Sequence, residues 1–487
     1  MNNENTIRDQ IKLENNPYGK SGFIDDEWPM YNYDLNNSGF SPSLAPNTCS
    51  ILWEKPIGYS RSSPAVVDGK VYIGSEDIIK CLDANNGNTI WVYQTSDDVH
   101  SSPVVLDGRV YIGSWDDLMY CLDAETGERI WIYPTGSVTS SPAVYDGKVY
   151  FASNYLNGCW VYCLETDMGN LVWRFKTGDY TVSSPAVSDG RVYIVSNDEY
   201  LYCLDADNGS MMWKFNTNDW FYTSSPVIYK DFVLIGHDTV FCLNKNTGKE
   251  IWNSTGHPRF ACNTPAVAYD KIYISEYYGK IFCLDVNDGH KIWEFKTGSN
   301  GEGGPPIVAD AKVFVGSADY NIYCFDALNG SIIWNYKIDG EVDSSPAVAY
   351  GNVYVHSEDT FYCFGGNQPP LVEIINPKED YFHLFGNPLL KNPLNLIGDT
   401  VSICGFKFKP VIIKVSDDQD NNEDLIIKIY LNGKEQKNVS YCPDSGLYKW
   451  FWTGPSFGKY YLQIIAEDSH GRIGINGIKI WNYCFFP

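Results

Sequence analysis

The stretch SSPAVVDGKVYIGSEDIIKCLDANNGNTIW, Ser62 to Trp91, decides the fold, because a near copy runs from Ser101 to Trp131. The unit recurs at intervals of about forty residues, and such a fixed period is typical of a repeat architecture. A proline preceded by small residues marks each unit, at Pro64, Pro103, Pro142, Pro185, Pro226, Pro265, Pro306 and Pro346. Tryptophans recur in step, at Trp53, Trp91, Trp131, Trp173, Trp213, Trp252, Trp293 and Trp334.

Each unit contains four short alternating segments, which in the first are SSPAVVDG, KVYIGS, DIIKCLDA and NTIWVYQTS. Dipeptides such as Asp68-Gly69 separate them and are hairpin signals, since Asp and Gly accept positive φ angles cheaply. Four antiparallel strands in forty residues predict one propeller blade, which must stack on its neighbours. The abundance of Tyr, Trp, Phe, Gly, Ser and Asn agrees with this all-β fold.

The two ends of the repeat array are incomplete in complementary ways. Trp53 precedes the first proline, whereas the unit that begins near Ser344 ends at Phe364 without a tryptophan strand. We therefore expect residues 50–58, SILWEKPIG, to supply the outer strand of the last blade. This closure predicts an eight-bladed β-propeller without a gap between its first and last blades.

The segments CLDANNGNTIW, CLDAETGERIW and CLDADNGSMMW resemble the tryptophan-docking motif of pyrroloquinoline-quinone (PQQ)-type propellers, over about Trp28 to Gly366. The resemblance implies that each tryptophan packs against the glycine region of a neighbouring blade. The glycine four residues before a tryptophan recurs at Gly87, Gly127, Gly169, Gly209, Gly248, Gly289 and Gly330. The opening WPMYNYDLNNSGFSPSLAPN resembles the lead-in of secreted or surface proteins of this family.

We divide the chain into a polar tail (1–27), the propeller (28–366), a Gly- and Pro-rich linker (367–370) and a second domain (371–487). Alternating segments of the second domain, among them VIIKVS, KYYLQIIAED and GIKIW, favour a β-sandwich. Its last part, FGKYYLQIIAEDSHGRIGINGIKIW, resembles immunoglobulin-like modules of bacterial and archaeal surface proteins. Such modules act as spacers or adhesive units.

The net charge of -24 lies almost entirely on the first 370 residues and argues against binding nucleic acid. It favours solubility and tolerates cationic partners. No apolar run is long enough to span a bilayer, and the first residues lack the apolar core of a signal peptide. The resemblance favours the cell surface, whereas the first residues do not look like a signal peptide, so the localisation stays open.

Eight of the 14 cysteines occupy one repeat position: Cys81, Cys121, Cys163, Cys203, Cys242, Cys283, Cys324 and Cys363. Equivalent positions on neighbouring blades are too far apart for disulfides, and no C-x-x-C pair occurs. We expect small buried side chains rather than a ring of metal or redox thiols. One disulfide among Cys404, Cys442 and Cys484 remains an alternative.

Quinoprotein dehydrogenases share this propeller, and their site, as the family implies, uses a vicinal cysteine disulfide, calcium and a catalytic aspartate. This sequence has no Cys-Cys pair and no long blade insertions, so we expect neither PQQ nor enzymatic activity. Asp418, Asp420 and Asn422 have calcium-loop spacing, but a glutamate stands where that loop needs glycine, which favours a solvated turn. His100 and His237 are expected to be solvated loop residues.

Aromatic residues in predicted blade loops break the pattern of small and acidic residues there. They either stack on sugars or grip a peptide, or they cover blade edges and close the channel. These candidate binding residues are Trp115, Tyr155, Trp220, Phe221, Tyr222, Phe260, Tyr277 and Tyr278. We expect both sets of loops to emerge on one rim, where Asp116, Asp117, Glu199 and Asp219 add acceptors.

The sequence thus predicts a non-enzymatic scaffold that binds a protein or a glycan. The same resemblance extends to the bacterial outer-membrane assembly scaffold, a propeller that docks partners. A quinone-dependent dehydrogenase and a structural surface-coat component are the alternatives.

Overall fold

The computed structural model describes residues 26–155, 158–218, 224–236, 239–254, 263–276, 278–298, 301, 303–365, 371–376, 381–384, 387–391, 400–403, 411–416, 425–431, 434–437, 439–442, 445, 447–450, 457–467 and 473–483. The chain divides into two compact units, Met1–Gly366 and Asn367–Pro487, and each is described by itself. The described residues of both units are built from strands, as the all-β prediction requires.

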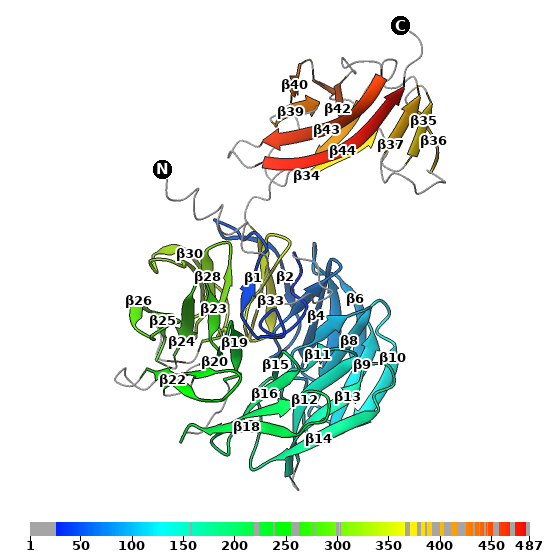
Figure 1. Cartoon of the computed structure of the whole chain (residues 1–487). Coiled ribbons are helices and arrows are strands. Elements are labelled where there is room, and N and C mark those ends of the chain that lie inside the picture. Colours follow the sequence, from blue (N-terminus) through cyan, green and yellow to red (C-terminus); the bar gives the residue numbers. More distant parts are fainter. Residues whose placement is uncertain are drawn as a thin grey trace. The chain divides into compact units, whose positions relative to one another are not determined.

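The first unit is a multi-bladed β-propeller (Figure 1). Its described residues form eight sheets, numbered here by the chain order of their innermost strands. Sheets 1 to 4 consist of β3 (Ala65–Val67), β4 (Lys70–Ser75), β5 (Ile78–Asp83) and β6 (Thr89–Gln94); β7 (Val104–Leu106), β8 (Arg109–Gly113), β9 (Leu118–Asp123) and β10 (Arg129–Pro134); β11 (Ala143–Tyr145), β12 (Lys148–Tyr155), β13 (Gly158–Glu165) and β14 (Leu171–Thr177); and β15 (Ala186–Ser188), β16 (Arg191–Ser196), β17 (Tyr200–Asp205) and β18 (Met211–Asn216).

The other four sheets repeat this order, with two additions from the beginning of the chain. Sheets 5 to 8 consist of β19 (Val227–Tyr229), β20 (Phe232–Gly236), β21 (Val240–Asn244) and β22 (Glu250–Asn253); β23 (Ala266–Ala268), β24 (Lys271–Ser275), β25 (Lys280–Asp285) and β26 (Lys291–Lys296); β27 (Ile307–Ala309), β28 (Lys312–Gly316), β29 (Asn321–Asp326) and β30 (Ile332–Lys337), with β1 (Phe40–Ser41) added parallel to β27; and β31 (Ala347–Ala349), β32 (Asn352–Ser357), β33 (Thr360–Gly365) and β2 (Ser50–Pro56).

The turns between the first two strands of a sheet fix its register. In sheet 1 the turn residues Asp68 and Gly69 have φ angles of 51° and 68°. Two successive positive φ angles match the twist of a hairpin, and Asp and Gly adopt them at low cost. Ala65 therefore lies opposite Tyr72.

Apolar side chains of consecutive sheets form shared clusters. They join sheets 1 and 2, sheets 2 to 4, sheets 4 and 5, sheets 5 and 6, and sheets 6 and 7. A further cluster contains Phe314 of sheet 7, Tyr354 of sheet 8 and Val66 of sheet 1. Each four-stranded sheet thereby buries the apolar faces that it could not bury alone.

The early strand β2 completes sheet 8. It pairs antiparallel with β33, and Trp53 lies opposite Cys363. About 310 residues separate these two partners along the chain. The outer strand that the repeat lacks at its end is therefore supplied from the beginning of the chain.

Tryptophans of the outer strands lie against glycines of the next sheet. A Cβ atom on Gly127 would lie 2.6 Å from Cδ2 of Trp91, and Nε1 of Trp91 donates to the Ala124 carbonyl at 3.0 Å. Gly127 also has a φ of +72°, so both its conformation and the close approach require glycine. The contacting pairs are Trp53–Gly87, Trp91–Gly127, Trp131–Gly169, Trp173–Gly209, Trp213–Gly248, Trp252–Gly289 and Trp293–Gly330.

Two hydroxyl positions explain the repeated Ser-Ser-Pro. The first serine faces its own sheet: Ser101 Oγ accepts from Gly113 N at 3.2 Å. The second links neighbouring sheets, because each backbone N–H donates to the hydroxyl of the following sheet at 2.8–3.1 Å. This hydroxyl chain runs through Ser345, Ser63, Ser102, Ser141, Ser184, Ser225 and Thr264. Sheet 7 carries Pro305 at this position, and proline has no N–H to donate.

Residues 26–46, called the N-terminal belt, run along the innermost strands. Backbone carbonyls of the belt accept from the second residue of six of these strands at 2.6–2.9 Å, including Val66, Val187 and Val308. Trp334 Nε1 donates to the belt carbonyl of Pro46 at 3.1 Å. An inner edge strand would otherwise leave its N–H groups unpaired, so the belt satisfies them. These contacts begin at Asp26, two residues before the predicted domain boundary.

The eight repeat cysteines are buried, as expected for small apolar side chains. Each described one is a free thiol, and burial raises the pKa of Cys81 to about 12. Because only the thiolate is nucleophilic, we predict that these eight resist iodoacetamide in the native protein and react in denaturant. Peptide mass spectrometry reads this directly. Cys49 and Cys442, which are partly exposed, serve as reactive controls, and native labelling of the eight would contradict the prediction.

The second unit contains two sheets around a core that includes Ile413, Tyr448, Trp450 and Leu462. One sheet has the order β34 (Leu371–Asn376), β38 (Val411–Ser416), β42 (Leu447–Trp450) and β41 (Ser440–Cys442). The other has the order β36 (Asn387–Lys391), β35 (Tyr381–Leu384), β37 (Thr400–Ile403), β44 (Ile473–Tyr483), β43 (Phe457–Glu467), β39 (Ile426–Leu431) and β40 (Lys434–Gln436). Asp418, Asp420, Asn422, Cys404 and Cys484 lie outside the described residues.

Candidate functional site

Two sets of loops meet on one rim of the propeller. In sheets 1, 2 and 4, a backbone bond joins the turn after the second strand to the connection that enters the same sheet, as from Glu76 N to Tyr59 O and from Asn197 N to Tyr180 O. We call this surface the loop rim. Its described residues are 57–64, 76–77, 95–103, 114–117, 135–142, 178–185, 197–199, 217–218, 224–226, 254, 263–265, 276, 278–279, 297–298, 301, 303–306, 317–320, 338–346 and 358–359.

Strand turns form the opposite rim, called the hairpin rim. They connect the first strand of a sheet to the second and the third to the outermost. Its residues are 68–69, 84–88, 107–108, 124–128, 146–147, 166–170, 189–190, 206–210, 230–231, 245–249, 269–270, 286–290, 310–311, 327–331 and 350–351.

The loop rim contains both fully described members of the predicted aromatic set, Trp115 and Tyr278, and both are exposed. Tyr155 ends β12, and its side chain lies outside the described part of the structure. The other predicted aromatics fall outside the described residues: Trp220, Phe221, Tyr222, Phe260 and Tyr277. Within the described residues, therefore, the predicted set is brought to this rim but not into one cluster.

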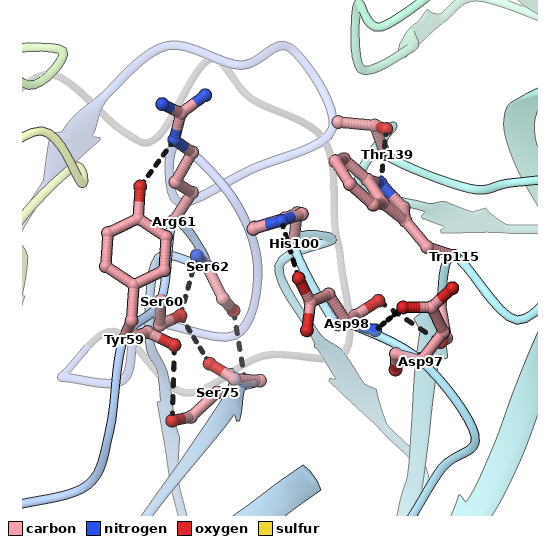
Figure 2. A network of polar contacts seen from close by, with 12 residues as sticks. Tyr59, Ser60, Arg61, Ser62, Ser75, Asp97, Asp98, His100, Trp115 and Thr139 are labelled. Atoms are coloured by element: carbon pink, nitrogen blue, oxygen red, sulfur yellow. Dashed lines mark hydrogen bonds and ion pairs between the residues drawn. The ribbon is translucent and has the colours of Figure 1, made fainter. Parts of the chain in front are cut away.

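His100 lies between Tyr59 and Trp115 (Figure 2). Its ring centroid is 4.4 Å from that of Trp115, and its side chain is only 10% exposed. Nε2 is 3.7 Å from Oδ2 of Asp98, while Nδ1 is buried and has no hydrogen-bond partner among the described residues. Burial lowers the pKa of His100, and Asp98 offsets part of this effect. The prediction of a solvated His100 is therefore wrong, and His237 lies outside the described residues.

Tyr59 and Arg61 border this histidine on the side of sheet 8. The Arg61 Nε donates to the Tyr59 hydroxyl at 2.9 Å and lies 3.7 Å from Oδ2 of Asp343. Burial raises the pKa of Asp343, and Arg61 opposes this rise. On the other side, Trp115 Nε1 donates to Thr139 Oγ1 at 3.0 Å. The geometry offers aromatic surfaces next to carboxylates, without a nucleophile and base pair within hydrogen-bond reach among these residues.

Sequence reasoning missed two exposed aromatics of this rim. Tyr59 precedes Ser60 and Arg61 in the connection that enters sheet 1, and Tyr320 stands in the turn after β28. Both are aromatic residues at loop positions of the repeat, and this criterion, which identified Trp115, would also have identified them. They were overlooked because tyrosines are frequent in the neighbouring strands.

The belt contains a buried carboxyl group at Asp34. Its Oδ1 accepts from Asn36 N and Ser38 N at 3.0 and 2.9 Å, and its Oδ2 accepts from the Ser38 hydroxyl at 3.0 Å. Burial raises the pKa of Asp34 to about 6, although these bonds favour the charged form. The stabilising contribution of the neutral acid is therefore complete below about pH 4 and is lost as the pH rises through 6.

We predict that Asp34→Asn gains stability relative to wild type by about 2 kcal/mol as the pH rises from 4 to 8. The amide oxygen of Asn can accept both backbone N–H groups, and its NH2 group can donate to the Ser38 hydroxyl instead of accepting from it. Thermal unfolding of both proteins across this range measures the difference. His356, whose pKa burial lowers to about 4, contributes equally to both proteins and cancels. A difference that stays constant with pH would refute the prediction, and Asp207→Asn controls for the removal of an exposed carboxylate.

The residues present do not fit a quinone site. The sequence has no adjacent cysteines, and the described cysteines are free. Within the described residues, one group of three side chains has the spacing of metal ligands: Asp285, Asp288 and His290. Asp288 and His290 are exposed, and the group surrounds a turn of the hairpin rim. This set therefore lies on the opposite rim from Trp115 and Tyr278.

The sequence family described as "Outer membrane protein assembly factor BamB" matches residues 42–160, 157–283, 223–302 and 279–364. Together these segments cover the repeats and most of the propeller. No curated protein matches the sequence. Among the described residues, we find no helix with the length and apolarity needed to cross a membrane.

Solved structures share the propeller fold at low sequence identity. BamB from Moraxella catarrhalis has 17% identity and a TM-score of 0.57, over 65% of this chain and 98% of BamB. Quinohemoprotein alcohol dehydrogenase from Comamonas testosteroni has 15% identity and a TM-score of 0.61, over 75% of this chain and 84% of the enzyme. The computationally designed Ika8 protein has 15% identity and a TM-score of 0.57, over 65% and 99%. Since an assembly factor and an enzyme both match, the fold alone does not assign a function.

Proposed function

The chain belongs to the BamB-type PQQ_2 repeat family, and on this premise we propose that it is a non-enzymatic scaffold whose loop rim binds a protein or a glycan. The carrying observation is the concentration of exposed aromatic side chains beside carboxylates on that rim, as at Trp115 and Tyr320. Large amphipathic rings are frequent at binding surfaces because they bury much area at low entropic cost. BamB, a neighbour named as an assembly factor, agrees with a protein partner.

We further propose that the eight sheets form a closed eight-bladed ring. The pairing of β2 with β33, the shared clusters and the bond from Ser345 N to Ser63 Oγ support closure. We propose that the second unit is an immunoglobulin-like spacer and that the protein acts at the cell surface. This location rests on the resemblance of both regions to surface proteins.

The docking contacts between indoles and glycines make the ring a rigid support in this proposal. A rigid ring holds its loops at fixed separations, so a partner does not have to order them on binding. No cofactor is needed for this role. Residues 417–424 of the second unit remain a candidate calcium loop on sequence grounds alone.

A ligand screen by thermal shift on the full chain tests the proposal. The panel contains oligosaccharides, peptides of varied charge, and PQQ with calcium. A ligand at 100 times its dissociation constant stabilises the folded form by about 2.7 kcal/mol. We expect a stabilising peptide or glycan whose effect disappears in a variant combining Trp115→Ala, Tyr180→Ala and Tyr320→Ala. The matched control changes outer-strand residues that are equally exposed, Ile90→Ala, Ile130→Ala and Ile332→Ala.

Two results would overturn this function. Calcium-dependent dye reduction with added PQQ and an alcohol would assign a dehydrogenase. Concentration-dependent assembly of the purified chain, seen by light scattering and unaffected by the aromatic variant, would assign a coat component.

A further inference from the structure

The loop rim has a strong excess of acidic over basic residues. Its described residues contain sixteen carboxylates, and their basic side chains are Arg61 and His100. The carboxylates are Glu76, Asp77, Asp97, Asp98, Asp116, Asp117, Asp179, Asp198, Glu199, Glu276, Asp319, Asp339, Glu341, Asp343, Glu358 and Asp359. Two nearby lysines, Lys80 of the third strand β5 and Lys296 of the outer strand β26, donate to rim carbonyls.

The hairpin rim is also acidic, but six of its twelve carboxylates form close ion pairs with basic side chains of strands or turns. Ion pairs there have N···O distances of 2.5–3.1 Å. They are Lys70–Glu125, Arg109–Asp167, Lys148–Asp207, Lys230–Asp270, Lys245–Asp189 and Lys312–Asp310. Among the described residues, basic side chains therefore offset more of the negative charge on the hairpin rim than on the loop rim. Such a one-signed surface attracts cations and steers cationic partners to it.

Exposed aromatic rings stand among these carboxylates. Tyr59, Trp115, Tyr180, Tyr278 and Tyr320 are 39–56% exposed. A ring face attracts an ammonium or guanidinium group, and neighbouring carboxylates strengthen the attraction. Aromatic and acidic side chains together thus favour a Lys or Arg side chain over a neutral ligand.

His100 supplies an independent observation. Because its Nε2 faces the Asp98 carboxylate, we place the proton of the neutral ring on Nε2. Nδ1 then keeps a lone pair, and this buried acceptor has no donor among the described residues. A buried polar atom without a partner is costly, so the site is incomplete until a donor arrives.

We propose that the loop rim receives a basic segment of a protein partner, and that one Lys or Arg side chain of this segment enters between Tyr59 and Trp115 and donates to Nδ1 of His100. This inference rests on the function proposed above. Asp97 and Asp98 provide the adjacent carboxylates. Since Nδ1 is enclosed, the exposed Trp115 ring moves aside as the donor enters.

A substitution at Arg61 is expected to change the affinity for a basic segment in an unusual direction. It lies beside the site, as its contact with Tyr59 shows (Figure 2), and its charge opposes a second cation. Replacing it with neutral Gln therefore strengthens binding of a basic segment. A glycan site, in contrast, would exchange the charged donors of Arg61 for a neutral amide and would not bind more tightly in Arg61→Gln.

Fluorescence anisotropy with the full chain tests this proposal. The probe is a labelled twelve-residue peptide of alternating Lys and Ser, and the comparison peptides replace Lys with acetyl-lysine or Glu. At 20 mM NaCl we expect Asp98→Asn to weaken binding of the Lys peptide at least tenfold and Arg61→Gln to tighten it at least threefold. The hairpin-rim control Asp207→Asn changes it less than twofold, and 200 mM NaCl weakens it severalfold.

Every other outcome overturns the inference. Equal losses in Asp98→Asn and Asp207→Asn would mean bulk charge attraction without a site. Equal binding of the acetylated peptide would exclude charge recognition. Weaker binding of the Lys peptide in Arg61→Gln would contradict the expected increase in affinity. Displacement of the peptide by millimolar calcium would indicate an ion site. A neutral peptide or glycan that needs Trp115 but not Asp98 would sink this inference while leaving the proposed function standing. The absence of any rim ligand would remove both.

Discussion

We expect a chain that begins at Gly58 to lose the propeller fold. This truncation removes β2, so β33 becomes an unpaired edge and the Trp53 indole no longer covers Gly87. It also removes the belt, which leaves inner-strand N–H groups without acceptors. Since native proteins are stable by only about 5–15 kcal/mol, the loss of a whole strand with its indole exceeds the margin. Circular dichroism and size-exclusion chromatography measure the outcome.

Complementation separates a specific loss from general damage. We expect a peptide of residues 26–57, added to the truncated chain during refolding, to restore the folded elution volume and cooperative melting. The control is a scrambled peptide of the same composition. A truncated chain that melts cooperatively at the wild-type temperature without the peptide would show that the pairing of β2 with β33 is dispensable.

The second large effect concerns two glycines with the same backbone conformation. Gly127 and Gly108 have φ angles of +72° and +70°, but only Gly127 faces an indole, that of Trp91. A Cβ on Gly108 meets nothing within 4 Å. We therefore expect Gly108→Ala to cost about 1–2 kcal/mol through backbone strain. Gly127→Ala should cost about 3–5 kcal/mol, because it also displaces a docked tryptophan.

Urea unfolding of the two variants in parallel isolates the value of the indole contact. The difference in their unfolding free energies cancels the strain that both share. If the two variants have the same midpoint, packing of Trp91 on Gly127 does not stabilise the propeller. Gly190, which also has a φ of +70° and an open surrounding, provides a second reference.

The repeat made much of the fold predictable because its contacts are also repeated. Asp68-Gly69 implies a hairpin from local chemistry alone, and the common spacing of Trp91 and Gly127 implies one packing rule for many sheets. The missing partner of Trp53 identified the strand that completes sheet 8. In each case the structural feature could be inferred from a local sequence pattern or from counting the repeats along the chain.

The belt was not predictable in this way. WPMYNYDLNNSGFSPSLAPN occurs once, and its bonds are mostly made by backbone carbonyls, which any residue type supplies. The Ser-Ser pairs were visible as a pattern. Their roles, however, depend on which sheets are neighbours, because Ser63 N reaches the hydroxyl of Ser102 across an interface.

The candidate site was predictable only in part. Trp115 was identified because it breaks the repeat at a loop position, and His100 was misjudged because its burial comes from Trp115 and Tyr59, which belong to other loops. The difference in charge between the two rims also could not be predicted from the sequence, because it depends on which residues the fold brings together. Lys70 and Glu125 are 55 residues apart in sequence, yet they form a pair.

The pairing of β2 with β33 has a consequence for the newly made chain. Trp53 emerges from the ribosome early, but its partner Cys363 emerges about 310 residues later. At roughly 5–20 residues per second, the wait is on the order of 15–60 s. During this interval the nascent polypeptide carries an unmatched apolar strand, so we expect chaperone engagement to persist until translation passes Gly365.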